Sequence, residues 1–301
     1  MSGLPPTSQA GPKPPWLKIR LDTGDNYRDL HRVVQGLKLH TVCQEARCPN
    51  IYECWGDRTA TFMVLGDTCT RRCGFCAVAT GRPRAVDPEE PDHVAEAVRH
   101  LELKHAVLTM VDRDDLPDGG AGHVAAVIRA VRRLNPGCDV EVLTSDFRGV
   151  ERPLDAILAE GPVTFSHNIE TVPRLYPAAR QGSRFEHSLG LLRQAVLWRD
   201  RAARPLVKTG LMVGLGEERD ELLATFAALA GAGVEILTLG QYLRPTLAHL
   251  PVVRYYPPDE FAELRARALR HGFRHVEAGP LVRSSYHARR HTQEAISGTP
   301  A

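Results

Sequence analysis

From residue 59 onward, short apolar runs alternate with segments whose apolar residues recur at the spacing of an α-helix. Alternation of strand and helix predicts parallel strands joined by right-handed crossovers, and runs that are apolar throughout indicate strands buried on both faces. Six such units are too few to close an eight-stranded barrel. The sequence therefore predicts an α/β fold, an open and partial (β/α)6 barrel, with strands at 60–65, 105–111, 140–144, 163–167, 206–213 and 234–239.

Both ends of the chain extend beyond this alternating region. With 301 residues, of which 43% are hydrophobic, the chain suits one large domain with short extensions. We expect a flexible Pro-rich arm at 1–15, an N-terminal extension at 16–58, the barrel at 59–257 and a C-terminal segment at 258–301. In that last segment the pattern predicts a helix over 258–271, a closing apolar run at 273–276 and a frayed tail after Arg290.

Charge and targeting signals restrict the partners and the compartment. A formal net charge of +2 gives no reason to expect a nucleic-acid or membrane partner. The sequence has no apolar run long enough to span a membrane, and its N-terminus resembles neither a signal peptide nor a transit peptide. We therefore expect a cytoplasmic protein. Seven cysteines, six of them between Cys43 and Cys76, favour metal ligation in a reducing compartment over disulfides.

Cys69, Cys73 and Cys76 form a C-x3-C-x2-C loop after the first predicted strand, where parallel barrels carry their chemistry. Three thiolates can hold a [4Fe–4S] cluster with one iron open, and this iron can chelate S-adenosylmethionine (SAM). An electron passed to the sulfonium then yields a 5′-deoxyadenosyl radical. The spacing resembles that of the radical SAM superfamily. Zinc is the alternative, but a structural zinc site needs four ligands, and no second C-x2-C pair exists.

Cys43, Cys48 and Cys54 form a second triplet, C-x4-C-x5-C, in the N-terminal extension. Its tight spacing beside the first triplet favours a second, auxiliary cluster. A zinc site completed by His40, or unligated core thiols, are the alternatives. Cys138 stands alone and is interpreted as a packing residue.

The two triplets in this order, together with the segment Arg283-Ser284-Ser285-Tyr286-His287, are similar to those of the lipoyl synthases over about residues 16–290. Further stretches that resemble this family lie at 111–120, 167–171, 214–217 and 240–246. Met110 and Ser166 depart from the family pattern, which has serine and asparagine there, and this affects local polar contacts only.

The resemblance implies a radical reaction that inserts two sulfur atoms, at C6 and C8 of an octanoyl chain carried on a lysine. A methylene C–H has no acidic proton, so a radical rather than a base must remove its hydrogen. The resemblance also implies that two molecules of SAM are consumed, that sulfides of the auxiliary cluster are the sulfur source, and that Ser284, preferred over Ser285, is the fourth ligand of that cluster. The alternative role for either serine is a hydrogen bond within a C-terminal turn.

Partners are implied by the same resemblance. The expected protein substrates are octanoylated lipoyl domains, namely 2-oxoacid dehydrogenase E2 subunits and the glycine cleavage H protein. An electron donor such as flavodoxin or ferredoxin and a cluster-repair carrier are expected as well. Arg283, Arg289 and Arg290 form a basic cluster that either steers acidic lipoyl domains or is a solvated charged end.

Residues that follow the predicted strands are the candidates for SAM binding. Asp118, Gly119 and Gly120 lie where superfamily members hold the methionine amino group, with a plain acidic turn as an equal alternative. Asn168 and Glu170 could donate or accept hydrogen bonds to the ribose or the amino group, and Arg180 could pair with the carboxylate. Gly214, Gly216 and Glu217 form a glycine turn that could accept the adenosyl moiety. Taken alone, any one of these residues is more often a solvated loop residue. These candidates are Asp118, Gly119 and Gly120; Asn168, Glu170 and Arg180; and Gly214, Gly216 and Glu217.

Two other functions compete with this interpretation. A two-cluster tRNA methylthiotransferase would carry an added RNA-binding module, and none is visible after Thr246. A zinc-stapled barrel that only binds a partner is the non-enzymatic alternative. The histidines His167, His187, His249 and His287 show no metal-ligand spacing and are interpreted as structural or surface residues.

Overall fold

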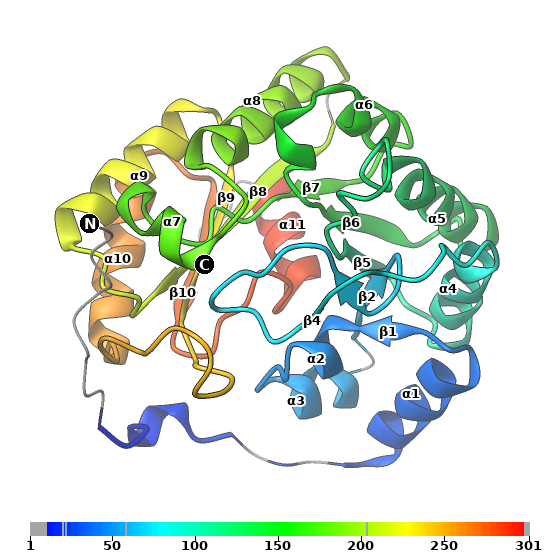
Figure 1. The fold of residues 1–301 in the computed structure, drawn as a ribbon, viewed down its shortest axis with the longest axis horizontal. Coiled ribbons are helices and arrows are strands. Elements are labelled where there is room, and N and C mark those ends of the chain that lie inside the picture. Colours follow the sequence, from blue (N-terminus) through cyan, green and yellow to red (C-terminus); the bar gives the residue numbers. More distant parts are fainter. Residues whose placement is uncertain (1–10, 20, 22, 58, 203, 298–301) are drawn as a thin grey trace.

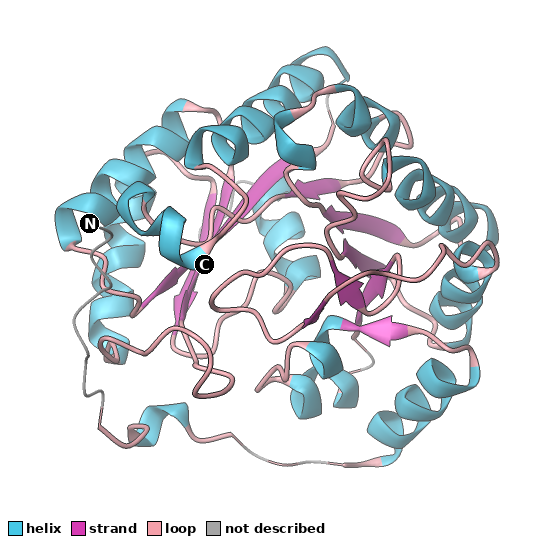
Figure 2. Cartoon of the chain, in the orientation of Figure 1, coloured by secondary structure: helices cyan, strands magenta, loops and turns pink. Residues whose placement is uncertain are grey.

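The structure, a computed structural model, describes residues 11–19, 21, 23–57, 59–202 and 204–297. In this part of the chain, one curved eight-stranded sheet forms the core (Figure 2). Seven of its strands run parallel to their neighbours, and β1, at one edge, is antiparallel to β2. In sheet order the strands are β1 (His40–Thr41), β2 (Thr61–Val64), β5 (His105–Met110), β6 (Asp139–Leu143), β7 (Thr164–Ser166), β8 (Leu206–Val213), β9 (Ile236–Gln241) and β10 (His275–Gly279).

Helices cover the outer side of the sheet, one in each crossover between parallel strands (Figure 1). Their apolar residues face inward; in α5, for example, Val124, Ile128 and Val131 are buried, as their spacing predicts. None of the helices in the described ranges combines the length and apolar character that crossing a membrane requires. The crossover helices are α4 (Glu90–His100), α5 (Ala121–Leu134), α6 (Arg152–Leu158), α8 (Phe185–Ala202), α9 (Arg219–Gly231) and α10 (Pro258–Arg270).

Short elements occupy the connecting loops. Two of them, β3 and β4, pair with each other outside the main sheet. They are η1 (Pro15–Leu17), β3 (Thr68–Cys69), β4 (Ala79–Thr80), η2 (Phe147–Gly149), η3 (Pro173–Leu175) and α7 (Tyr176–Ala179).

The sheet confirms the predicted open barrel. Its order ends at β1 and β10, and no pairing between described residues joins these two edges. All six predicted strands are present, and the run at 273–276 opens a seventh parallel strand, β10. The last predicted strand begins two residues later than expected, at Ile236. Val234 instead closes the turn after α9, where its backbone N–H donates to the carbonyl of Leu229 at 3.2 Å.

The prediction of a frayed tail after Arg290 is wrong. Residues Ala288–Ser297 form a helix, α11, that lies in the middle of the ring of strands (Figure 1). Its residues His291, Thr292 and Ala295 are buried, and the Thr292 hydroxyl is 2.9 Å from that of Thr164 in β7. A polar sequence is typical of an exposed end, but here its polar side chains are turned toward polar groups inside the barrel.

The N-terminal extension is attached to the barrel by its strand β1. It also contains α1 (Asp25–Gly36), α2 (Val42–Glu45) and α3 (Ile51–Gly56). Trp55 of α3 is fully buried and packs against Tyr27 of α1, with ring centroids 5.0 Å apart. Most of the expected Pro-rich arm, residues 1–10, lies outside the described residues.

Candidate active site

A cavity of about 740 Å³ opens at the carboxyl ends of the parallel strands. All six motif cysteines line it, together with residues that follow β5, β6, β7, β9 and β10. Parallel strands end at one edge of a sheet, so residues far apart in sequence meet there. The strand-end residues that matter below are Asp112, Asn168, Glu170, Arg283 and Ser284.

The loop that holds Cys69, Cys73 and Cys76 is fastened to the barrel by backbone hydrogen bonds. The N–H of Thr70 donates to the carbonyl of Asp112 at 3.0 Å, and the N–H of Gly74 donates to Ala179 at 2.8 Å. His249 Nε2 lies 2.9 Å from the carbonyl oxygen of Cys76. The loop is therefore positioned by contacts with three separate parts of the chain.

Arg71, inside the same loop, is the centre of a buried ionic network. Its guanidinium contacts three carboxylates, Asp112 at 3.3 Å, Asp114 at 2.7 Å and Asp146 at 2.5 Å. Burial lowers the pKa of Arg71, but these carboxylates outweigh it and hold the pKa above its usual range. A buried arginine paired on three sides fixes the loop's orientation toward the strands.

The cysteine thiols are free, and five of the six motif thiols are only partly buried. Burial, with the nearby Asp112 carboxylate, raises the pKa of Cys69 to about 12; burial also raises that of Cys43 to about 11. The thiols are therefore protonated unless a metal displaces the proton. The Cys69 Sγ donates to Asp112 Oδ2 at 3.6 Å, which gives that proton an acceptor.

The spacing of the sulfurs suits a cluster better than a single zinc ion. Thiolates around one tetrahedral zinc lie about 3.8 Å apart, given Zn–S bonds of about 2.3 Å. Neither cysteine triplet is among the groups of described side chains that could hold a single metal ion. Two sets of three thiols around one cavity fit the widely spaced corners of iron–sulfur clusters.

The upstream triplet is gathered by two short helices. Cys43 lies in α2 and Cys54 in α3, while Cys48 is in the turn between them, its N–H bonded to the carbonyl of Cys43 at 3.0 Å. Burial raises the pKa of Cys54, and the nearby thiols of Cys43 and Cys48 raise it further. The three thiols are thus close enough to interact electrostatically.

The loop 280–287, which follows β10, brings Ser284 to the same cavity. Two long-range hydrogen bonds fasten this loop to the N-terminal extension: Asn50 Nδ2 donates to the Leu281 carbonyl at 2.7 Å, and Tyr286 Oη donates to Glu53 at 2.8 Å. The Ser284 hydroxyl makes no hydrogen bond with another described residue. The turn-capping alternative for Ser284 therefore has no supporting contact in the described part of the chain.

Three of the predicted SAM residues lie together on the cavity wall. Arg180 Nη1 donates to the carbonyl of Asn168 at 2.7 Å, and Asn168 Nδ2 donates to Glu170 at 3.1 Å. Burial raises the pKa of Glu170, while Arg180 lowers it. The Asn168 Oδ1 is buried against Gly210 of β8 and has no hydrogen-bond partner among the described residues.

The other six predicted SAM residues do not line the cavity. Asp118 accepts hydrogen bonds from the N–H groups of Gly120 and Gly122, at 2.9 and 2.8 Å, at the start of α5. Glu217 likewise accepts from the N–H groups of its own turn, at Gly214 and Leu215. The role of Asp118, Gly119, Gly120, Gly214, Gly216 and Glu217 in SAM binding stays a prediction.

Both of these turns need glycine for packing. A Cβ on Gly120, whose φ is +88°, would lie 2.4 Å from the Leu65 side chain. A Cβ on Gly214, with φ +103°, would lie 2.6 Å from the Arg254 carbonyl oxygen. The chain's own packing is therefore enough to explain these glycines.

Sequence reasoning missed Arg71 and Asp112 as parts of the site. Asp112 follows β5 by two residues, so its position at the carboxyl end of a strand was the available signal. Arg71 has no such signal, because its three partners come from loops that only the folded sheet brings together. Of the basic cluster, Arg283 is turned inward toward Cys48 and Glu170, whose charges raise its pKa although burial lowers it more.

Comparison with known families gives consistent matches. Residues 63–229 match the model of the radical SAM superfamily, and residues 7–48 match that of the N-terminal domain of lipoyl synthase. A lipoyl synthase of Rubrobacter xylanophilus is 56% identical over 95% of this chain and 88% of its own length. A lipoyl synthase of Koribacter versatilis is 53% identical over 92% of this chain and 90% of its own length.

Solved structures share the fold at low identity. The hydrogenase maturase HydG matches with a TM-score of 0.55 and 14% identity, covering 78% of this chain and 62% of its own. SuiB of Streptococcus suis, solved with S-adenosylmethionine bound, matches with a TM-score of 0.53 and 9% identity, covering 74% of this chain and 50% of its own.

Proposed function

Because the chain belongs to the lipoyl synthase family of radical SAM enzymes, we propose that its cavity inserts sulfur at C6 and C8 of an octanoyl chain on a lipoyl-domain lysine. The chain is a radical SAM enzyme of lipoyl cofactor synthesis, and SAM and iron–sulfur chemistry follow from its family. The number of clusters, their ligands and the sulfur source are the parts that we propose.

One observation carries the proposal: both cysteine triplets and Ser284 line a single cavity. A reaction that makes a carbon radical and then adds sulfur to it needs both functions within reach of one substrate carbon. Two separate cavities would require the substrate to leave one site before it reached the other. A shared cavity avoids that step.

In this arrangement Cys69, Cys73 and Cys76 hold the first [4Fe–4S] cluster. When bound, that cluster and SAM supply a one-electron cleavage and a primary alkyl radical that can remove hydrogen from an unactivated methylene. Arg71 keeps the loop oriented, and Asp112 accepts the proton that Cys69 must lose. We assign Asn168, Glu170 and Arg180 to SAM, because they lie together on the cavity wall.

Cys43, Cys48, Cys54 and Ser284 hold the auxiliary cluster, which we propose as the sulfur source. The ligands then come from two parts of the chain: the extension at 16–58 and the segment at 258–301. The hydrogen bonds of Asn50 and Tyr286 support this grouping, because they fasten the Ser284 loop beside the upstream cysteines.

The partners follow from the reaction. We propose octanoylated lipoyl domains of 2-oxoacid dehydrogenase E2 subunits and of the glycine cleavage H protein as substrates. A one-electron donor such as flavodoxin or ferredoxin, and a carrier that rebuilds the auxiliary cluster, complete the system. Free thiols in both triplets are consistent with a reducing, cytoplasmic setting.

The test is an anaerobic incubation of cluster-loaded protein with SAM, a reductant and an octanoyl-lysine peptide, followed by mass analysis. The wild type is expected to add two sulfur atoms to the peptide and to release 5′-deoxyadenosine. Peptide that gains no sulfur while SAM is cleaved normally would contradict the proposed substrate. Zinc without acid-labile sulfide in the purified protein would contradict the cluster assignment.

Cysteine variants separate the two clusters, which gives the first prediction. Cys73→Ala is expected to abolish 5′-deoxyadenosine, because the cluster that binds SAM is lost. Cys48→Ala is expected to leave SAM cleavage largely intact and to abolish sulfur insertion. Cys138→Ala is the matched control, since Cys138 is a buried core residue away from the cavity and should retain both activities.

A further inference from the structure

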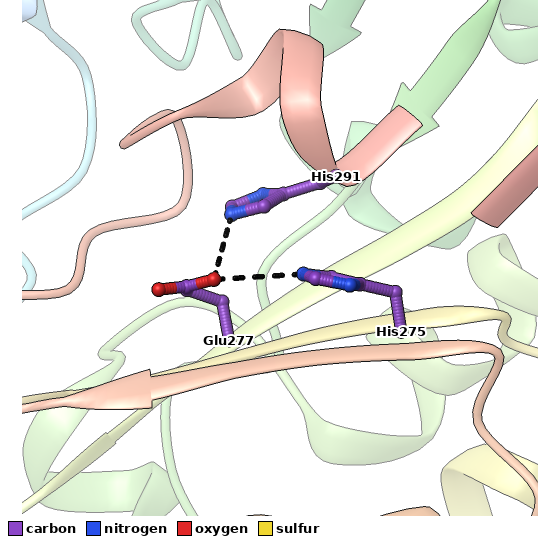
Figure 3. Close-up of side chains that lie close together, drawn as sticks. All are labelled: His275, Glu277 and His291. Atoms are coloured by element: carbon purple, nitrogen blue, oxygen red, sulfur yellow. Dashed lines mark ion pairs between the residues drawn. The ribbon is translucent and has the colours of Figure 1, made fainter. Parts of the chain in front are cut away.

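A second group of ligand-type side chains lies at the amino ends of the strands, where α11 packs against β10 (Figure 3). His275 and Glu277 are two residues apart in β10, so they point to the same face of the sheet. His291 and Glu294 are three residues apart in α11, so they share one face of the helix. The packing of the helix against the strand brings all four side chains together.

One carboxylate oxygen of Glu277 is equally distant from two imidazole nitrogens. Glu277 Oε2 lies 3.6 Å from His275 Nε2 and 3.6 Å from His291 Nε2 (Figure 3). Both separations are too long for hydrogen bonds. They are close to the roughly 3.4 Å between two ligands of one tetrahedral ion with bonds of about 2.0–2.1 Å. Within the described ranges, this is the one group of three such side chains whose ligand atoms lie within 4.8 Å of one another.

Three of the four histidine ring nitrogens in this cluster are buried and lack hydrogen-bond partners among the described residues. His291 is 0% exposed and neither of its ring nitrogens is satisfied; His275 is 3% exposed and its Nε2 is unsatisfied. An imidazole nitrogen without a hydrogen-bond partner has a lone pair that can bind a metal ion.

A second carboxylate, that of Glu294, lies beside the Nδ1 atom of His275. Glu294 Oε2 lies 2.9 Å from His275 Nδ1, on the side of the ring away from the nitrogen that points to Glu277. A carboxylate at this place holds the ring so that Nε2 faces Glu277. Metal-binding histidines are commonly oriented by such a carboxylate.

The net charge of the cluster also favours the binding of a cation. Arg290 Nη2 donates to Glu277 Oε2 at 2.8 Å and balances one of the two carboxylates, Glu277 and Glu294. The neighbouring Lys208 is already paired with Glu141, at 2.9 Å. Apart from the two imidazoles, the two carboxylates and Arg290 sum to one negative charge. Arg290 is 48% exposed on its side chain and can turn toward solvent.

We propose that His275, Glu277 and His291 bind a divalent transition-metal ion, zinc by its ligand preference, with Glu294 as the residue that orients His275. Two histidines and one carboxylate are a known zinc ligand set and leave a fourth position for water. The ion would join α11 to β10 and so fix both ends of the loop that carries Ser284. The proposal stands on these four side chains and does not depend on the role of Ser284.

The test compares zinc binding by cluster-loaded wild type and variants, measured by anaerobic titration calorimetry. All variants keep the six motif cysteines, so a difference in stoichiometry reports only the new site. Wild type is expected to bind one zinc equivalent more than His291→Gln and Glu277→Gln. Glu294→Gln is expected to weaken binding roughly 10- to 100-fold, the usual effect of losing an orienting partner. Arg290→Gln is expected to strengthen it, because a competing cation is removed.

His123→Gln is the matched control, because His123 also contacts a carboxylate, Glu90 at 2.6 Å, but without a second histidine. It should bind zinc as the wild type does. Anomalous diffraction at the zinc edge from wild-type crystals gives a second readout that needs no variant. Equal stoichiometry in wild type, His291→Gln and Glu277→Gln, or no anomalous peak among the three ligands at saturating zinc, would overturn the proposal.

Discussion

The role of Ser284 depends on its surroundings in the folded chain. A serine in a polar C-terminal segment is ordinarily a turn residue. Here its hydroxyl lines the cysteine cavity, makes no hydrogen bond within the described residues, and lies in a loop that Asn50 and Tyr286 fasten to the upstream cysteines. These contacts favour a ligand role. A serine oxygen is a harder and more readily protonated ligand than a thiolate, so its iron would be the most easily released corner of the cluster.

The second prediction concerns this ligand. Ser284→Cys is expected to retain a full auxiliary cluster that is harder to dismantle, and lipoyl product should fall roughly 10- to 100-fold while SAM cleavage continues. Iron and sulfide analysis, combined with mass analysis of the peptide, measures both effects. Ser285→Ala is the control, because Ser285 lines the same cavity and is not the proposed ligand. Wild-type product from both Ser284→Cys and Ser284→Ala would show that the ligand assignment is wrong.

At the scale of the elements, the turns that follow the strands differ in whether their polar side chains bond to the backbone or line the cavity. The turn before α5 uses the carboxylate of Asp118 to accept the first N–H groups of the helix. The turn after β7 instead leaves Asn168 and Glu170 on the cavity wall. Position after a strand therefore marks a candidate, and the hydrogen bonds decide whether the side chain is used internally.

The third prediction tests this distinction. Asp118→Ala is expected to lower the free energy of unfolding by about 1 kcal/mol, the usual cost of a lost helix cap, and to leave SAM affinity unchanged. Asn168→Ala is expected to weaken SAM binding with a smaller effect on stability. Thermal unfolding and equilibrium SAM binding measure the two quantities. If Asp118→Ala folds normally but loses SAM affinity, the sequence-based role of Asp118 is correct and the capping role is secondary.

At the scale of the whole molecule, the two ends of the barrel carry different groups of polar side chains. The carboxyl ends of the strands hold the cysteines, while the amino ends are filled by α11 with its buried histidines and carboxylates. His167, between the two, is fully buried: its Nδ1 lies 2.9 Å from the Thr144 carbonyl and its Nε2 lies 3.0 Å from Ser188 Oγ. Burial, together with the charge of Arg180, lowers the pKa of His167 to about 3.

The fourth prediction is a loss of stability in mild acid. The folded pKa of His167 lies below the unfolded value of about 6.5, so between these values the unfolded chain binds one more proton. This contribution is fully present above pH 6.5 and falls by about 1.4 kcal/mol per pH unit well below it. Thermal unfolding between pH 7 and 5 should show a shallower loss in His167→Gln than in the wild type. His100→Gln, at an exposed position, should keep the wild-type slope, and identical slopes in all three would contradict the prediction.

The sequence determined the architecture, because periodicity and burial are local properties of the chain. Runs such as 206–213, which is apolar apart from Lys208, Thr209 and Gly210, indicated strands buried on both faces, and the alternation with amphipathic helices indicated parallel pairing. The cysteine spacing likewise predicted the chemistry, because three thiols within eight residues are close enough along the chain to serve one centre. The family resemblance added Ser284, and the structure brings it to the cysteine cavity.

Only the tertiary structure decided which polar side chains are used by the protein itself and which remain for a ligand. Asp118 and Glu217 are satisfied by backbone N–H groups of their own turns, whereas Asn168 keeps an unpaired oxygen. The position of α11 and the meeting of His275, Glu277 and His291 were equally hidden, because their spacing along the chain matches no ligand motif. Hydrogen bonding and metal ligation depend on distances between atoms, and for residues far apart in sequence those distances exist only after the sheet has folded.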